Sequence, residues 1–411
     1  MSLVVQKYGG SSVASLDRLR TVAGHVAATV RTGQQVLVTI SAMGEQTDDL
    51  LNMALALNPK PAGRELDMLL TAGERISAAL LAIALDNQGV QSVSLTGSQC
   101  GILTDDTHGN ARISAILGDR VRDNLAAGRV VIVAGFQGVT THTKEITTLG
   151  RGGSDLSAIA LAASLQADTC QLYKDVAGVF TCDPRSVPAA RHLPHLSWPA
   201  MTALAWGGAA VLHPRGAHLA AKFRIPFEIR SSLDLSQPGT HIHGSTPLER
   251  PQTLALAHKR GMALATYRFT AGDASSILAQ VLAWLWRHGE APQVNQQIRQ
   301  HDGTIDLTLA IAANLVTDLE LMLASVSAQT RGRWECLNFK AGVATVAVVG
   351  QGYKQSPETT ATICAALPKQ LCFIDVTDQQ IALVLDEAQL DRALTVLHAE
   401  LIEKPTSSNG L

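Results

Sequence analysis

The segment Leu3-Val4-Val5-Gln6-Lys7-Tyr8-Gly9-Gly10 is mostly apolar and ends in a pair of glycines. We predict a buried strand here, and the apolar spacing from Leu16 to Val30 predicts an amphipathic helix after it. The same order recurs along the first half. Strands are expected at 36–41, 90–96, 130–134, 169–173 and 226–230, and helices at 65–86, 154–165 and 215–222. This alternation predicts an α/β fold in which helices sandwich a mostly parallel sheet, with ligands beyond the carboxyl ends of the strands.

Length and charge narrow the class of protein. At 411 residues the chain is too long for one hydrophobic core, which predicts two or three domains. The 33 Lys and Arg residues nearly balance the 35 Asp and Glu residues, so no nucleic-acid or membrane partner is expected. No signal-peptide pattern is found, and polar residues interrupt the apolar stretches. The six cysteines lie far apart, so we expect a cytoplasmic protein with reduced thiols.

The second half of the chain predicts a different architecture. We expect a catalytic domain at 1–232, a linker rich in Ser, Pro, Gly and His at 233–260, and two small α+β domains in tandem at 261–330 and 331–404. The last helix carries an apolar stripe, which indicates packing in a core: Leu390, Ala393, Leu394, Leu397 and Leu401. The polar segment 405–409 is expected to be disordered.

The first glycine motif has the residues of a phosphate site. Gly9 and Gly10 carry no Cβ, so the backbone can approach a phosphate and its N–H groups can bond the phosphate oxygens. Lys7 beside them can offset the charge of a transferred phosphoryl group. A plain turn is the simpler interpretation of two glycines after a strand. The GxxxxGK[ST] order of a Walker A loop is absent.

A second glycine motif, Gly150-Arg151-Gly152-Gly153-Ser154-Asp155, precedes an apolar helix. Backbone N–H groups at a helix N-terminus favour an anion, and Arg151 can grip a carboxylate with two hydrogen bonds. Asp155 in the first turn fits a functional site, although it would also serve as a partner for the helix dipole. Elsewhere in the chain, Thr47 is predicted to cap a helix whose first turn contains Asp48 and Asp49.

A third motif follows the strand expected at 169–173. It reads Tyr173-Lys174-Asp175-Val176-Ala177-Gly178-Val179-Phe180, followed shortly by Cys182-Asp183-Pro184-Arg185. Acidic residues, Gly and Pro at the end of a strand suit a nucleotide pocket, with Arg185 near phosphate. Taken alone, the segment is better explained as a polar turn.

Several motifs together resemble those of aspartokinases, in order and in spacing. The resemblance covers residues 3 to about 232 strongly and the remainder weakly. It rests on the three motifs above and on Ser41-Ala42-Met43-Gly44 with Thr47-Asp48, Ala72-Gly73-Glu74-Arg75-Ile76-Ser77 and Val211-Leu212-His213-Pro214-Arg215. It implies the amino-acid kinase fold, followed by two ACT-like domains.

The resemblance also implies roles for individual residues. Lys7 would stabilise the transferring phosphoryl group, and Asp155 would orient it. ATP would be bound by Gly9, Gly10, Ser11, Lys174, Asp175, Phe180, Asp183 and Arg185. L-Aspartate would be bound by Ser41, Thr47, Glu74, Arg151 and Ser154, with Glu74 facing its ammonium and Arg151 its carboxylates.

The implied reaction is ATP-dependent phosphorylation of the side-chain carboxylate of L-aspartate to 4-phospho-L-aspartate, the first step of aspartate-derived amino-acid biosynthesis. A carboxylate is ionised near neutral pH, so the attack needs no general base. Catalysis then rests on alignment and charge neutralisation. Mg²⁺ would come with ATP. No residues indicate a resident metal site, since His241 and His243 are expected in a surface loop.

Two departures from the family pattern stand out. Ala210 occupies the lysine position of a segment that usually reads Gly-Ala-Lys-Val-Leu-His-Pro, and that lysine normally reaches the ATP phosphates. Lys174 stands where threonine is common, and we hypothesise that Lys174 partly compensates. In the tail, Gly272-Asp273-Ala274-Ser275-Ser276 lacks the usual Pro-Gly of the first ACT loop. We therefore predict weak or altered feedback inhibition by an amino-acid effector.

These departures leave two alternatives to an active aspartate kinase. One is a catalytically impaired paralogue that acts as a regulatory subunit. The other is a kinase for another carboxylic amino acid in a specialised pathway. The intact set of Thr47, Glu74, Arg151, Ser154 and Asp155 argues against both. The resemblance also implies a homodimer or a higher homo-oligomer.

Overall fold

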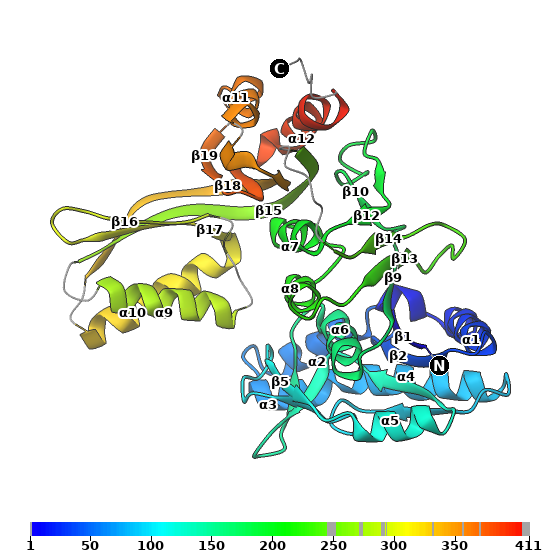
Figure 1. Ribbon diagram of the computed structural model, residues 1–411. Helices are drawn as coiled ribbons and strands as arrows, with labels where there is room; N and C mark the ends of the chain where they lie inside the picture. The colour runs from blue at the N-terminus through cyan, green and yellow to red at the C-terminus, as the bar shows by residue number, and fades with distance from the viewer. Residues whose placement is uncertain are drawn as a thin grey trace. The chain divides into compact units, whose positions relative to one another are not determined.

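The chain forms two compact units in the computed structural model, and each is described by itself (Figure 1). The structure describes residues 2–244, 252–270, 274–288, 292, 294–330, 333–355, 357–369 and 371–404. The first unit comprises Met1–Val179, His192–Met201 and Ala210–Thr246. The second comprises Phe180–Arg191, Thr202–Ala209 and Pro247–Leu411. The domain bounds expected from the sequence stay a prediction.

The first unit is built on an eight-stranded sheet with the strand order β12-β14-β13-β9-β1-β2-β6-β3. From β13 to β3 all neighbouring strands are parallel, whereas β14 is antiparallel to β13 and parallel to β12, so these last two strands run in the opposite direction. This confirms the predicted α/β fold with a mostly parallel sheet. The strands are β1 (Leu3–Tyr8), β2 (Gln35–Ile40), β3 (Ser92–Leu95), β6 (Val130–Ala134), β9 (Thr169–Lys174), β12 (His195–Leu196), β13 (Phe227–Ser231) and β14 (Thr240–Ile242).

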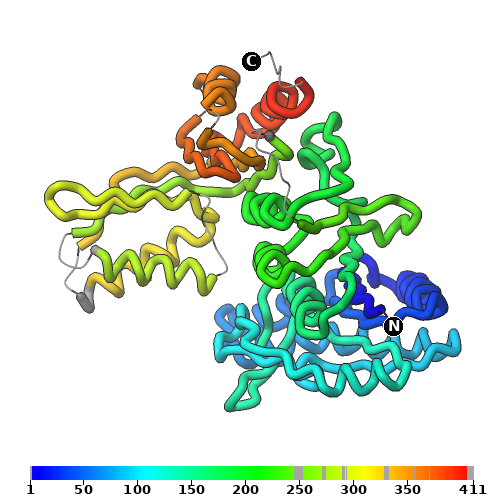
Figure 2. The backbone as a smooth tube through the Cα atoms, in the orientation of Figure 1, coloured from blue at the N-terminus to red at the C-terminus, as the bar shows by residue number. Residues whose placement is uncertain are grey.

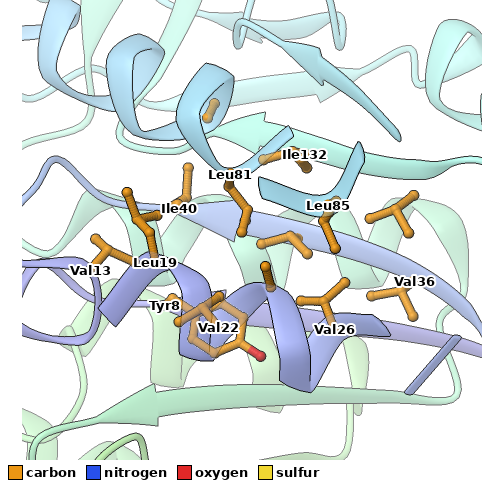
Figure 3. Close-up of a cluster of buried hydrophobic side chains, with 14 of the residues drawn as sticks. Tyr8, Val13, Leu19, Val22, Val26, Val36, Ile40, Leu81, Leu85 and Ile132 are labelled. Carbon is orange, nitrogen blue, oxygen red and sulfur yellow. The ribbon is translucent and has the colours of Figure 1, made fainter. Parts of the chain in front are cut away.

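Helices cover both faces of this sheet. On one face α1 (Leu16–Arg31) and α4 (Ala72–Asp86) pack together on the strands, and Figure 3 shows Leu19 and Val22 of α1 facing Leu81 of α4. The other face carries α6 (Gly153–Leu165), which contacts β1, β2 and β9 and is covered by α8 (Pro214–Phe223). Because α6 has neighbours on both sides, it is apolar around its whole circumference. The first unit also contains α2 (Gln46–Leu57), α3 (Gly63–Leu70) and α5 (Asp119–Ala126), and α7 (Trp198–Gly207) follows β12.

The helix expected at 65–86 is divided into α3 and α4 at Thr71. The two helices together, Gly63–Asp86, are long and apolar enough to cross a membrane by length and composition alone. The sequence had not predicted such a segment, because polar residues interrupt its apolar stretches. Two of its acidic side chains, those of Asp67 and Glu74, are nevertheless buried in the protein, as are Leu81 and Leu85. The segment therefore packs as part of the core of the first unit.

A second, smaller sheet has the order β5-β4-β7-β8. Its strands are β4 (Ile102–Thr104), β5 (Ile113–Ile116), β7 (Gln137–Thr140) and β8 (Ile146–Thr148). A short 3₁₀ helix, η1 (Gly10–Val13), follows β1. The predicted cap of α2 is wrong, because the helix begins one residue before Thr47 and Glu45 occupies the capping position. Asp48 and Asp49 lie in its first turn, as predicted.

The second unit contains a six-stranded antiparallel sheet with the order β16-β17-β15-β18-β20-β19. Its two longest strands, β15 (Gln252–Phe269) and β18 (Trp334–Gln351), pair along their length (Figure 2). The others are β16 (Asn295–Arg299), β17 (Ile305–Ala312), β19 (Leu371–Val376) and β20 (Gln380–Asp386). One half of β15 pairs with β17, and the opposite half of β18 pairs with β20, so two α+β halves share both strands. Their sequence order was predicted, but this sharing was not.

Two pairs of helices pack on this sheet. α9 (Ala274–Arg287) and α10 (Val316–Thr330) cover one half, and α11 (Pro357–Ala366) and α12 (Leu390–His398) cover the other. The predicted apolar stripe of α12 is confirmed, since Leu390, Leu394 and Leu397 are fully buried. The remaining short elements are β10 (Val179–Phe180), β11 (His192–Leu193), η2 (Ala313–Leu315), η3 (Tyr353–Gln355), η4 (Glu387–Gln389) and η5 (Ala399–Glu403). The predicted effector loop at Gly272 and Asp273, and the polar end at 405–409, lie outside the described residues.

Candidate functional site

Three charged side chains meet at the carboxyl ends of two neighbouring strands. Lys7 lies near the end of β1, Lys174 ends β9, and Asp155 lies in the first turn of α6. The Lys7 ammonium is 2.7 Å from Asp155 Oδ1. The Lys174 ammonium donates a hydrogen bond of 2.5 Å to Asp155 Oδ2. A carboxylate that is only 3% exposed therefore holds two cations, one on each oxygen. We call these three residues the lysine–aspartate cluster.

The register of the sheet explains why both lysines reach the same carboxylate. In the parallel pair of β1 and β9, Tyr8 lies opposite Tyr173, and the two rings stack with centroids 4.8 Å apart. Both hydroxyls contact the ring of His25 on α1, at 2.6 Å and 3.4 Å. Because successive side chains of a strand point to opposite faces, the tyrosines face α1, and Lys7 and Lys174 face α6.

The electrostatics of the cluster favour an incoming anion. Burial would raise the pKa of Asp155, but the charges of Lys174 and Lys7 outweigh burial and hold that pKa well below its ordinary value. Burial lowers the pKa of Lys7, attraction to Asp155 opposes this shift, and repulsion from Lys174 adds to it. Two ammonium groups share one carboxylate, so the cluster has an excess of positive charge.

The glycine turn after β1 is shaped by its packing. A Cβ on Gly10 would lie 2.9 Å from the carbonyl oxygen of Gly44, so only glycine allows these two loops to approach. A Cβ on Gly9 would lie 3.4 Å from the Lys7 ammonium nitrogen. Ser11 is exposed in the 3₁₀ turn that follows. Gly9 therefore lies beside the lysine–aspartate cluster, and Gly10 serves the packing of the turn.

A buried acid lies next to this turn. Glu74, in the first turn of α4, is 3% exposed and accepts a hydrogen bond of 3.2 Å at Oε1 from the Ala42 backbone N–H. Its other oxygen, Oε2, has no hydrogen-bond partner among the described residues. Burial raises the pKa of Glu74 from 4.5 to about 7, although backbone hydrogen bonds and the charge of Lys7 oppose the shift. Ser41 and Thr47 are half-buried. An unpartnered buried carboxyl group is suited to a cationic ligand.

Two polar residues of the second glycine motif lie in different environments, Ser154 in the core and Arg151 at the surface. Gly150 and Gly152 have φ of +83° and +72°, which favour glycine, and a Cβ on Gly152 would lie 2.8 Å from the His213 ring. Ser154 is buried beside Gly135. The Arg151 side chain is 88% exposed and forms an ion pair of 2.9 Å with Asp48 of α2.

Sequence reasoning did not identify the network that holds this motif in place. Asp67 of α3 is 1% exposed and accepts hydrogen bonds from His108 Nδ1 at 2.7 Å, the Gly109 backbone at 3.1 Å and Thr148 Oγ1 at 2.5 Å. The sequence near Asp67 gave no signal for this network, because its partners lie 41, 42 and 81 residues away.

Arg215 of α8 also stabilises the loops around the second glycine motif. The Arg215 guanidinium donates hydrogen bonds of 2.7 to 2.8 Å to Asn110 Oδ1 and to the carbonyl oxygens of Leu149 and Ala111. Burial lowers the pKa of Arg215 to about 10, with repulsion from Arg112 adding to the shift. Arg215 therefore joins the loop before β5 to the start of the glycine motif.

Three of the predicted nucleotide residues fall in the second compact unit, namely Phe180, Asp183 and Arg185. Their segment packs into the core of that unit, where Thr181 Oγ1 and His398 Nε2 lie 2.8 Å apart. The Arg185 guanidinium pairs with Asp183 at 2.8 Å. Asp175 and Ala210 are exposed residues of the first unit.

Among the described residues, no three His, Cys, Asp or Glu side chains gather as a metal site. The surface loop expected for His241 is wrong, because His241 lies in β14 between β12 and β13, where its Nδ1 is 3.1 Å from Glu228 Oε1 and its ring stacks on His195.

Comparisons with known proteins agree with this geometry. The model of the amino acid kinase family matches residues 2–231. An aspartokinase of Mycolicibacterium smegmatis is 41% identical over 97% of this chain and 96% of its own length. E. coli aspartokinase III in complex with aspartate and ADP (R-state) has the same fold, with a TM-score of 0.78 at 24% identity over 97% of this chain and 99% of that chain. The same enzyme in complex with lysine and aspartate (T-state) gives a TM-score of 0.70, with equal identity and coverage. The chain therefore belongs to the amino acid kinase family, as one of its aspartokinases.

Proposed function

We propose that this aspartokinase transfers the γ-phosphoryl group of MgATP to the side-chain carboxylate of L-aspartate at the lysine–aspartate cluster. The observation that carries the proposal is a buried carboxylate with a lysine on each oxygen, at the carboxyl ends of parallel strands. Such an excess of buried positive charge suits a group whose negative charge is spread over three oxygens during transfer. Aspartate attacks as an ionised carboxylate, so no side chain has to remove a proton.

The aspartate site is proposed beside Glu74 and the second glycine motif. Glu74 Oε2, which has no partner among the described residues, would accept hydrogen bonds from the substrate ammonium. Arg151 would exchange Asp48 for a substrate carboxylate, since an exposed ion pair is worth about 1 kcal/mol or less. Ser41, Thr47 and Ser154 complete the proposed aspartate-binding set.

The nucleotide is assigned to the side of the cluster that carries the first glycine turn. Lys7 would neutralise the transferred group, with Gly9, Gly10 and Ser11 along the phosphates. Lys174, Asp175, Phe180, Asp183 and Arg185 complete the proposed ATP-binding set, and Mg²⁺ enters as part of the substrate. The catalytic domain at 1–232, the linker at 233–260 and the ACT-like domains at 261–330 and 331–404 remain our proposed domain bounds.

Further properties are proposed from the relatives. Because the E. coli relative binds lysine together with aspartate, we assign an amino-acid effector to the second unit, with weak or altered inhibition. We also propose a cytoplasmic homodimer or higher homo-oligomer that supplies the aspartate-derived amino-acid pathway.

The test is turnover of the full chain with MgATP and L-aspartate, trapping the acyl phosphate as its hydroxamate. We expect product with L-aspartate, little with L-glutamate, and none with Lys7→Ala. Absence of aspartate-dependent product from a folded protein that still binds ATP would overturn the proposal and favour a regulatory subunit.

A further inference from the structure

Lys174 is more than the partner that neutralises Asp155. The Lys7 ammonium, 2.7 Å from Oδ1, already neutralises that buried carboxylate. A second ammonium 2.5 Å from Oδ2 adds a positive charge that no further acid of the cluster balances. Burying an unbalanced charge costs free energy, so a purely structural role would be poorly served by this arrangement.

The environment of Lys174 leaves it able to bind a ligand. Its side chain is 17% exposed, against 6% for Lys7, so it lies on the more open side of Asp155. Its ammonium has three donors, and within the described part of the chain Asp155 is its only hydrogen-bonded acceptor. Two N–H groups are therefore available to an anion without breaking the bond to Asp155.

We propose that Lys174 is a second catalytic residue, whose ammonium binds the transferred phosphoryl group together with Lys7. Asp155 is then the positioning residue, since it holds one lysine on each oxygen and so sets their spacing. This inference rests on the proposed function. During the reaction a carboxylate oxygen of aspartate bonds to the γ-phosphorus, and the bond from that phosphorus to the bridging oxygen of ADP breaks. The electron pair leaves with ADP, and both lysines keep their protons.

The experiment compares Lys174→Met and Lys174→Arg with wild type, with Lys60→Met as control because Lys60 is an exposed lysine outside the site. We expect Lys174→Met to lower kcat by about 10²-fold, as for loss of one preorganised donor, with KM for aspartate changed less than threefold. Lys174→Arg keeps the charge and should recover part of kcat, and Lys60→Met should equal wild type.

A binding measurement separates catalysis from ground-state binding of the nucleotide. Aluminium fluoride bound with ADP mimics the phosphoryl group in transfer. In the presence of aspartate, Lys174→Met should weaken the binding of ADP with aluminium fluoride at least tenfold more than it weakens the binding of ADP alone. Equal weakening of both, or a kcat within threefold of wild type, would overturn the role of Lys174. A wild-type enzyme without aspartate-dependent turnover would instead overturn the proposed function. Thermal unfolding shows whether Lys174→Met is folded. If it is not, the kcat and binding of Lys174→Arg are compared with those of wild type instead.

Discussion

Asp155 and Asp67 are both buried carboxylates of the first unit, but the groups around them differ in kind. Asp67 accepts hydrogen bonds from His108, Gly109 and Thr148, which are short or backbone donors fixed by their own elements. Asp155 instead holds two ammonium groups at the ends of long, flexible side chains. The first arrangement can change little without breaking the loop that it supports, whereas the second can turn its spare donors toward a ligand.

The comparison separates two uses of a buried acid. A carboxylate satisfied by fixed donors stabilises the fold and is costly to remove, because its partners are left without acceptors. A carboxylate that binds more cations than it can neutralise creates a site for a further anion. We infer that Asp67 supports the loops and Asp155 serves the chemistry, and the predictions below test this difference in order of effect.

The largest effect is expected at Lys7. Lys7→Met removes the more deeply buried cation, and kcat for acyl-phosphate formation should fall by about 10³-fold, the upper range for one preorganised donor. Thermal unfolding should stay close to that of wild type, since Lys174 still pairs with Asp155. Steady-state kinetics and a melting curve check both parts. A tenfold loss or less would show that Lys7 is not the principal cation.

The next effect concerns pH and Glu74. A neutral Glu74 cannot pair with an ammonium, and its pKa is raised to about 7, so aspartate binding must drive off a proton below that pH. We expect KM for aspartate to be about tenfold higher at pH 6 than at pH 8. Glu74→Gln should raise KM and remove this pH dependence. An unchanged pH dependence in Glu74→Gln would assign the titration to another group.

Glu74 also makes stability depend on pH, with a definite sign. Because the pKa is raised from 4.5 to about 7, the folded state keeps a proton that the unfolded state has lost between these values. The free energy of unfolding should therefore fall as pH rises from 5 to 8, by about 3 kcal/mol from this group. Denaturant unfolding of wild type and Glu74→Gln across this range measures the contribution.

The smallest effect is expected at Asp48, whose carboxylate holds Arg151 at the surface. Asp48→Asn removes a competitor of the substrate carboxylate, so KM for aspartate should fall by less than about fivefold, with kcat unchanged. Asp49→Asn is the matched control, because Asp49 lies in the same helical turn. A rise in KM for Asp48→Asn beyond that of Asp49→Asn would show that Asp48 helps to bind aspartate.

Local patterns in the sequence predicted much of the first unit. The alternation of apolar strands and helices indicated a parallel sheet, and the glycine turns marked the ends of β1 and the start of α6. The motifs also named Lys7, Asp155 and Lys174, which the structure brings into contact. These features depend on neighbouring residues, so a sequence contains enough information for them.

Contacts between distant segments were not predictable in this way. Asp67 bonds to Thr148, 81 residues away, and Arg151 bonds to Asp48, 103 residues away. The two halves of the second unit share β15 and β18, because long strands can pair with different neighbours along their length. Such pairings depend on the fold and leave no local pattern.

The most direct test compares Asp155→Asn with Asp67→Asn in parallel measurements of kcat and thermal unfolding. We expect Asp155→Asn, at a temperature where it is folded, to lose at least 10²-fold in kcat, because one neutral amide cannot position two cations. Its unfolding temperature should also fall, because Lys7 and Lys174 lose their carboxylate partner. We expect Asp67→Asn to unfold at a clearly lower temperature but, at a temperature where it is folded, to keep kcat within about tenfold. If Asp155→Asn stayed active, or if the two variants, each measured where it is folded, lost kcat alike, the lysine–aspartate cluster would not be the centre of phosphoryl transfer.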